Sequence, residues 1–290
     1  MNLSMYAYFS SMIRHRGVAA AIDFAHTHGF SSVEFLEMPS PDKALSVPST
    51  DAARQIKAQL DKNDLSVSCY SVGLTVLDPS TGLPITQNLE ELSRLAEIAS
   101  ALGSPYFHHT LILNVSPTLH KSYLPFEKLL DRLIEVALPI AQKATALGMT
   151  TLYEPQGFYV NGIDQFGVFY ERMKAMGVKV GVCGDIGNSL FVDVDPTDFF
   201  RAFAKEIRHI HLKDYRQSPN AQPDETQSIS GTRLEQVLLG EGVVDFQACL
   251  DILKEVGYDG TYALEGSYTS DVEESFAKEI ATVRKLFGDT

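Results

Sequence analysis

Four short apolar runs in the second half of the chain each end in a residue that can bind a divalent metal ion. These residues are Glu154, Asp185, His211 and Glu265. They are separated by 31 residues (154 to 185), 26 residues (185 to 211) and 54 residues (211 to 265, which includes a polar loop). A spacing of about one strand plus one helix, with a ligand at each carboxyl end, predicts one metal site at the top of a parallel barrel.

Alternation along the expected strands supports the same site. In the segment 261–265, small residues share the face of Glu265 and bulky residues occupy the opposite face. In the segment 180–185, small residues likewise share the face of Asp185 and bulky residues occupy the opposite face. In the segment 207–213, two histidines and a lysine alternate with isoleucine and leucine, so His211 lies on the polar face. All these candidate ligands are therefore expected to face the barrel interior.

Three carboxylates and one imidazole form an oxygen-rich ligand set. Such a set suits Mn²⁺, Mg²⁺ or Co²⁺ better than a metal selected by thiolates, and Zn²⁺ is also compatible with it. We expect one divalent ion, with Mn²⁺ as the first choice. Without a cation, Glu154, Asp185 and Glu265 would repel one another strongly, and a divalent ion removes that cost.

The elements that must position these residues alternate between strands and helices. Strands are expected at 5–9, 32–36, 65–70, 106–109, 207–213 and 261–265, with two more that end at 154 and 185. Helices are expected at 18–28, 51–62, 88–102, 125–147, 163–176 and 272–287, with Asn88, Asp195 and Asp245 as N-caps. Eight such units predict an α/β fold, a single (β/α)8 TIM barrel, in one domain that covers 1–290.

Composition limits the partners of the chain. The net charge of −13 disfavours nucleic acid, because binding to a phosphate backbone relies on Lys and Arg. The three cysteines form no CxxC pair, as expected of reduced thiols in a cytoplasmic protein. We expect no signal peptide and no membrane partner, because no apolar run approaches ~18 residues. A homo-oligomer is compatible with the sequence.

Several motifs of the chain resemble those of a known family. They are Leu152-Tyr153-Glu154-Pro155, Gly184-Asp185-Ile186-Gly187-Asn188, His209-Ile210-His211-Leu212-Lys213-Asp214, Leu239-Gly240-Glu241-Gly242-Val243-Val244-Asp245-Phe246, and Gly257-Tyr258-Asp259-Gly260 leading to Glu265. The chain is similar to the xylose-isomerase-like TIM barrels, in particular the sugar-phosphate isomerase/epimerase branch with ketose 3-epimerases, such as D-tagatose 3-epimerase, and hydroxypyruvate isomerases. This resemblance implies that the four candidate ligands bind one metal ion. It also implies that Glu154 and Glu265 are the catalytic acid/base pair.

The implied reaction explains why two glutamates are needed. A sugar or sugar-phosphate isomerase or epimerase removes a proton next to a ketose carbonyl, and a metal stabilises the resulting enediolate. One carboxylate takes the proton and a second, on the other face of the substrate, returns one. Glu154 and Glu265 belong to different strands, so they can flank a sugar that lies between them.

Other residues are candidates for binding the sugar. Glu34 faces inward from the second strand, and His108 and His109 end the fourth, where we assign substrate contact to His109. The remaining candidates are Asn188, Lys213 and Arg216. The family's epimerases usually have His where this chain has Asn188, and Arg216 is the nearest match to their loop arginine. These departures concern sugar specificity and not the metal ligands.

Three other functions fit parts of the sequence. An inosose-type dehydratase on the same fold would form an enolate and then lose hydroxide. A non-catalytic sugar-binding barrel would not need both Glu154 and Glu265. An abasic-site endonuclease would need more metal-binding histidines and a basic face, and only 8 His with a net charge of −13 argue against it. The glycines from Gly181 to Gly187 do not match the GxGxxG fingerprint of dinucleotide-binding folds.

Overall fold

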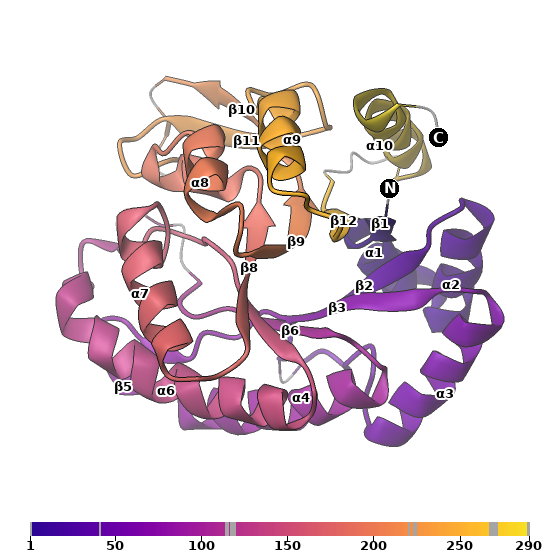
Figure 1. Ribbon diagram of the computed structural model, residues 1–290, viewed down its shortest axis with the longest axis horizontal. Coiled ribbons are helices and arrows are strands. Elements are labelled where there is room, and N and C mark those ends of the chain that lie inside the picture. Colours follow the sequence, from indigo (N-terminus) through magenta and orange to yellow (C-terminus); the bar gives the residue numbers. More distant parts are fainter. Residues whose placement is uncertain are drawn as a thin grey trace.

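The strands of the computed structural model close into a parallel barrel. Their order around it is β1-β12-β9-β8-β7-β6-β3-β2, and the helices are arranged around them (Figure 1). The strands are β1 Asn2–Met5, β2 Ser32–Glu37, β3 Ser66–Val72, β6 Tyr106–His109, β7 Thr150–Tyr153, β8 Val180–Asp185, β9 Ile207–Leu212 and β12 Thr261–Leu264. The structure describes residues 2–40, 42–113, 116, 120–219, 221–222, 225–266 and 272–288. The predicted (β/α)8 TIM barrel is therefore confirmed.

Apart from α1, which was not predicted, the helices agree closely with the prediction. They are α1 Ala7–Arg16, α2 Val18–Thr27, α3 Thr50–Lys62, α4 Thr86–Ala101, α6 Phe126–Ala146, α7 Asp164–Ala175, α8 Pro196–Phe203, α9 Phe246–Glu255 and α10 Val272–Phe287. Two short ribbons, β4 (Leu77–Asp78) with β5 (Leu83–Pro84) and β10 (Asp214–Ser218) with β11 (Arg233–Val237), lie outside the barrel sheet. Among the described residues, no helix combines the length and apolar character needed to cross a membrane.

The first strand was predicted in the wrong place. It ends at Met5 instead of Phe9, and the residues from Ala7 onward form helix α1. In that helix Tyr8, Phe9 and Met12 are buried at helical spacing, and the helix ends at Gly17 with a positive φ of 83°. As a consequence Tyr6 directly follows the carboxyl end of β1, where barrel sites are built.

The N-caps were predicted correctly for two helices and incorrectly for one. Asp195 caps α8 by accepting from Thr197 N–H at 2.8 Å, and Asp245 caps α9 by accepting from Ala248 N–H at 2.9 Å. Helix α4 instead starts at Thr86, and the side chain of Asn88 donates to the Thr75 carbonyl at 2.7 Å. Asn88 therefore anchors the preceding loop and does not begin the helix.

Two separate apolar clusters hold the barrel together. The larger one lies between strands and helices and includes outward-facing residues such as Ile210 and Leu212. A small cluster of Cys69, Leu152 and Cys183 lies inside the barrel. These side chains fill the interior, and the polar residues that follow them on the same strands lie nearer the carboxyl ends.

A buried aspartate fixes the loop that follows β11. The Asp214 carboxylate accepts from the backbone N–H groups of Gly240 (3.0 Å), Gly242 (2.8 Å), Val244 (3.2 Å) and Tyr215 (2.9 Å). A Cβ at Gly242 would lie 2.1 Å from Asp214 Oδ1, so only glycine fits there. The motif Gly240-Glu241-Gly242 is thus explained by a structural contact.

Asp214→Ala should destabilise the fold by roughly 2–4 kcal/mol, because it leaves several backbone N–H groups without their acceptor. Urea unfolding monitored by circular dichroism measures this loss. The matched control is Asp245→Ala, which removes a single helix cap and should cost about 1 kcal/mol. Equal effects of the two substitutions would contradict the assigned role of Asp214.

Candidate metal centre

The structure brings the four candidate ligands together at the carboxyl ends of four neighbouring strands. One ligand atom from each of Glu154, Asp185, His211 and Glu265 lies within 4.8 Å of the others. His211 Nδ1 is 2.9 Å from Glu154 Oε1 and 3.1 Å from Glu265 Oε2. In an octahedral site with bond lengths of about 2.1 Å, neighbouring ligands are about 3.0 Å apart. The cluster therefore has the size of a divalent metal site.

Two of the carboxylates are anchored through one oxygen and direct the other toward charged groups of the cluster. Asp185 Oδ1 accepts from the backbone N–H groups of Gly187 (2.9 Å) and Asn188 (2.7 Å). Glu265 Oε1 accepts from Lys213 Nζ at 2.9 Å. Asp185 Oδ2 and Glu265 Oε2 are buried, and they face Lys213 Nζ at 2.8 Å and His211 Nδ1 at 3.1 Å, respectively. Carboxylate oxygens gathered beside one imidazole fit a hard divalent cation.

Lys213 is the internal cation of the site. Its ammonium lies 2.8 Å from Asp185 Oδ2 and 2.9 Å from Glu265 Oε1, and it donates to Asn188 Oδ1 at 3.3 Å. A Cβ at Gly187 would come within 3.1 Å of the Lys213 side chain and 2.9 Å of the Tyr215 ring. The glycine therefore leaves the space that the lysine occupies.

The imidazole of His211 is held from several sides. Tyr6 stacks on the ring with a centroid distance of 4.7 Å and an interplanar angle of 23°. His211 Nε2 lies 3.1 Å from Glu34 Oε1, opposite the nitrogen that faces Glu154 and Glu265. The role of Tyr6 was not recognised from the sequence, because the first strand was expected to continue past it.

Burial and neighbouring charges shift the protonation of these groups. Burial alone would lower the pKa of His211, but the adjacent Cys183, Glu34 and Glu154 groups raise it well above its ordinary value. Burial raises the pKa of Asp185 to about 8, although Lys213 opposes this shift. For Glu265 the effect of burial is outweighed by Lys213 and His211, which lower its pKa. His211 therefore holds an extra proton at neutral pH in the metal-free protein, whereas Asp185 is surrounded by the donors Gly187 N–H, Asn188 N–H and Lys213 Nζ, as expected of a carboxylate.

Metal affinity should increase with pH as a result. The ion must replace the proton on His211 Nδ1, and below the pKa of His211 this release lowers the apparent Kd about tenfold for each unit by which the pH rises. Calorimetric titration with Mg²⁺ between about pH 6 and pH 9, in buffers of different ionisation enthalpy, counts the protons released. An affinity that does not change with pH would contradict this protonation state.

The predicted sugar-binding residues lie in different surroundings. Asn188 is buried beside Lys213, and its Nδ2 has no hydrogen-bond partner among the described residues. Lys213 contacts the cluster directly. Arg216 lies on the β10–β11 ribbon, is half exposed, and pairs with Glu235 and Glu241 at 3.7 Å each. The contacts thus join Asn188 and Lys213 to the site, whereas those of Arg216 are with the outer loop.

The structure directs His108 toward the cluster in place of His109. His108 Nε2 lies 3.5 Å from Glu154 Oε2. His109 packs edge-on against Tyr153, and its Nδ1 hydrogen-bonds to the Thr110 carbonyl at 3.0 Å. Strand alternation explains the difference, because residues 107 and 109 share the face that meets the helices. The apolar residue at 107 was the signal that would have selected His108.

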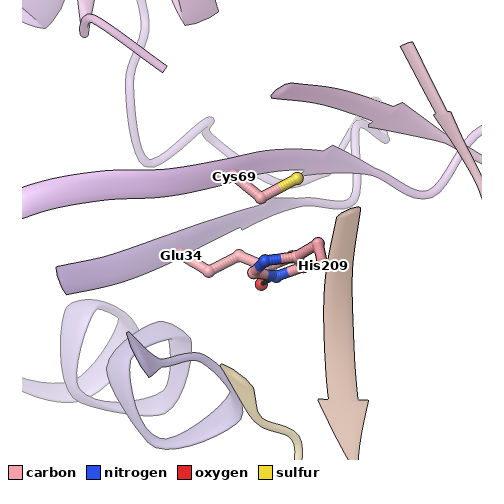
Figure 2. Close-up of side chains that lie close together, drawn as sticks. All are labelled: Glu34, Cys69 and His209. Carbon is pink, nitrogen blue, oxygen red and sulfur yellow. Dashed lines mark hydrogen bonds and ion pairs between the residues drawn. The ribbon is translucent and has the colours of Figure 1, made fainter. Parts of the chain in front are cut away.

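Glu34 faces the barrel interior as expected, but it is fully buried. Its oxygens contact His209 Nε2 at 2.6 Å, Ser71 Oγ at 2.6 Å and His211 Nε2 at 3.1 Å. Figure 2 shows the first of these pairs together with Cys69. These contacts connect Glu34 to protein side chains and leave it no exposed surface for a sugar.

A comparison with known proteins identifies the family. The model of the family described as xylose isomerase-like TIM barrel matches residues 22–286. The chain belongs to this family.

Two curated relatives match a shorter part of the chain. An inosose dehydratase from Lacticaseibacillus casei is 30% identical over 90 residues, which cover 30% of this chain and 30% of that protein. The L-ribulose-5-phosphate 3-epimerase UlaE of Escherichia coli is 35% identical over 100 residues, which cover 34% of this chain and 30% of that protein. The matches thus span less than a third of each relative.

The fold also resembles solved structures over nearly its whole length. A xylose isomerase-like TIM barrel protein from Mycobacterium smegmatis, solved in complex with magnesium, is similar with a TM-score of 0.70 and 18% identity. The similarity covers 98% of this chain and 96% of that chain. At this level of identity the comparison shows the fold.

Proposed function

We propose that this chain is a divalent-metal-dependent isomerase or epimerase of a ketose sugar or sugar phosphate. The observation that carries the proposal is the pair of glutamates, Glu154 and Glu265, whose oxygens lie 2.9 and 3.1 Å from the same nitrogen of His211. They come from β7 and the end of β12, on either side of β8 and β9. Two carboxylates that bind one ion from different sides can each reach one of the two faces of a bound sugar.

The proposed metal ligands are Glu154, Asp185, His211 and Glu265. When bound, the cation stabilises negative charge on the carbonyl and neighbouring hydroxyl oxygens of the sugar. The magnesium in the M. smegmatis structure supports Mg²⁺ as the ion to test first, and Mn²⁺ remains our sequence-based choice for comparison.

The chain's own residues supply the proton transfers in this proposal. One glutamate of the pair removes the proton from the carbon beside the carbonyl, and the other returns a proton to the opposite face. Lys213 holds one oxygen of Glu265, so the second oxygen keeps a fixed direction. The unpartnered Nδ2 of Asn188 and the interior-facing His108 are the proposed contacts for sugar hydroxyl groups.

Exchange of a carbon-bound hydrogen tests the proposal. Ketoses and ketose phosphates are incubated with the Mg²⁺-loaded or Mn²⁺-loaded protein in D₂O, and the products are identified by NMR. We expect a product with deuterium on the carbon beside the carbonyl. Turnover with complete retention of the original hydrogen would indicate hydride transfer and contradict the proposed proton transfer.

A dehydratase is the second candidate, because one of the matching relatives is an inosose dehydratase. The first step would be the same proton removal by a glutamate, followed by loss of a hydroxide from the neighbouring carbon. Lys213, whose ammonium contacts Asp185 and Glu265, is the proposed proton donor for that leaving group. The same NMR screen separates the two, since a dehydratase gives a product that is smaller by one water.

A further inference from the structure

We propose that Glu34 is a positioning residue that fixes the tautomer and orientation of His211. The proposal rests on the proposed metal centre and adds a residue that does not itself contact the ion. Glu34 comes from β2, on the other side of β1 and β12 from the strand of His211. Its carboxylate is fully buried, so it can act only through the side chains that surround it.

The contact with Glu34 determines which proton His211 keeps when a metal ion replaces the other. A carboxylate accepts hydrogen bonds, so the nitrogen that faces it must donate. His211 Nε2 lies 3.1 Å from Glu34 Oε1 and is therefore the donor. In the neutral ring the lone pair is then on Nδ1, the nitrogen that faces Glu154 and Glu265. Carboxylate partners of this kind orient metal-bound histidines and tune their affinity.

Two further donors keep Glu34 itself in place. Ser71 donates to Oε1 at 2.6 Å, and His209 Nε2 lies 2.6 Å from Oε2. His209 Nδ1 has no hydrogen-bond partner among the described residues, so Nε2 is the nitrogen through which the ring is held by Glu34. With one oxygen tied to His209, the carboxylate cannot rotate away from His211.

The same residues could be read as a second metal site, because Glu34, Cys69 and His209 lie close together inside the barrel (Figure 2). The distances favour a hydrogen-bonded group instead. Glu34 Oε2 and His209 Nε2 are 2.6 Å apart, whereas two ligands of a tetrahedral zinc ion with bonds of about 2 Å are about 3.3 Å apart. The Cys69 thiol hydrogen-bonds with Ser71, and burial raises its pKa, so it is not a thiolate.

Metal titration of four proteins tests this role: the wild type, Glu34→Gln, Glu34→Ala and Cys69→Ala. Binding of Mn²⁺ alone is followed by calorimetry, and bound Mn²⁺ per chain is counted by elemental analysis. Glu34→Ala should weaken binding about 10- to 100-fold, the usual effect of losing such a partner. Glu34→Gln keeps an acceptor for His211 and should recover part of the affinity. Cys69→Ala, a neighbouring buried residue with no contact to His211, should bind like the wild type.

A spectroscopic measurement separates positioning from a general loss of structure. In the Mg²⁺-loaded protein with ¹⁵N-labelled histidine, the Nε2–H signal of His211 should move upfield in Glu34→Gln because its acceptor loses its charge. The signal should stay in place in Cys69→Ala. Glu34→Gln is nearly isosteric, so it provides the test even if Glu34→Ala does not fold.

The outcomes distinguish this proposal from the proposed function. If the wild type binds one ion and both Glu34 variants bind it equally well, the role of Glu34 is refuted and the metal centre is retained. A second ion that is lost in both Glu34→Ala and Cys69→Ala would also refute it, in favour of a second metal site. A wild type that binds no divalent ion would refute both proposals.

Discussion

Glu265→Gln should lower the turnover of the ketose substrate about 10²- to 10⁴-fold, the usual contribution of a positioned acid or base. A glutamine keeps an oxygen that can coordinate a cation, but it cannot take up or return a proton. The side chain is also nearly isosteric with glutamate, so Lys213 and His211 should keep their positions. Steady-state kinetics and metal content of the same preparation measure the two effects separately.

The structure offers a matched control for this substitution. Glu235 is a partly exposed glutamate that pairs with Arg216 and Arg233 on the outer ribbon. Glu235→Gln removes the same charge from the chain and should leave turnover within about twofold, because exposed ion pairs contribute little. Glu154→Gln should cause a loss of similar size to Glu265→Gln. Full activity in either glutamine variant would rule out the assignment of that glutamate.

The barrel and the position of the four candidate ligands were predictable because both follow from simple periodicities. The spacing of the strand ends gives the number of strand-plus-helix units, and two-residue alternation gives the side chains that face inward. His211 and Glu265 illustrate this, since both lie beside small interior residues such as Cys183 and Ala263. When the barrel closes, residues at the ends of adjacent strands become neighbours, so their clustering can be predicted without any other sequence signal.

Features that depend on three-dimensional contacts were not predictable in the same way. Tyr6 can stack on His211 because β1 ends at Met5, the residue before it. The sequence around Tyr6 has no clear hydrophobic periodicity, so the end of the strand could not be predicted from it. The depth of Glu34 below the open end depends on the stagger between β2 and β9, which alternation does not specify. Alternation alone separates His108 from His109, because the apolar Phe107 shares its face of the strand with His109.

The loop residue Arg216 marks another limit of the sequence. Its position after the His211 motif suggested a contact with the sugar. Residues Asp214–Ser218 instead pair with Arg233–Val237 in an antiparallel ribbon, and the arginine lies among the acidic residues of that ribbon. Ribbon pairing between segments separated by a polar loop is a long-range interaction, and local patterns do not reveal it.

His211→Ala should weaken metal binding by about 100-fold or more, which exceeds the 10- to 100-fold effect typical of residues behind a metal ligand. The substitution removes the single nitrogen ligand of the proposed set and leaves Glu34 without one of its donors. It also removes the positive charge that lies between Glu154 and Glu265 in the metal-free protein. Competition between the protein and a chelator for Mg²⁺ or Mn²⁺ measures the change in Kd.

His109→Ala is the appropriate control, because His109 is an equally buried histidine that packs on the outer side of the barrel against Tyr153. It should lower the unfolding temperature through lost packing and leave the Kd for the metal unchanged. The two histidine variants therefore separate loss of a ligand from loss of a buried aromatic ring. If His109→Ala weakened metal binding as much as His211→Ala, the reduced affinity would reflect general damage to the barrel, and His211 could not be assigned as a ligand.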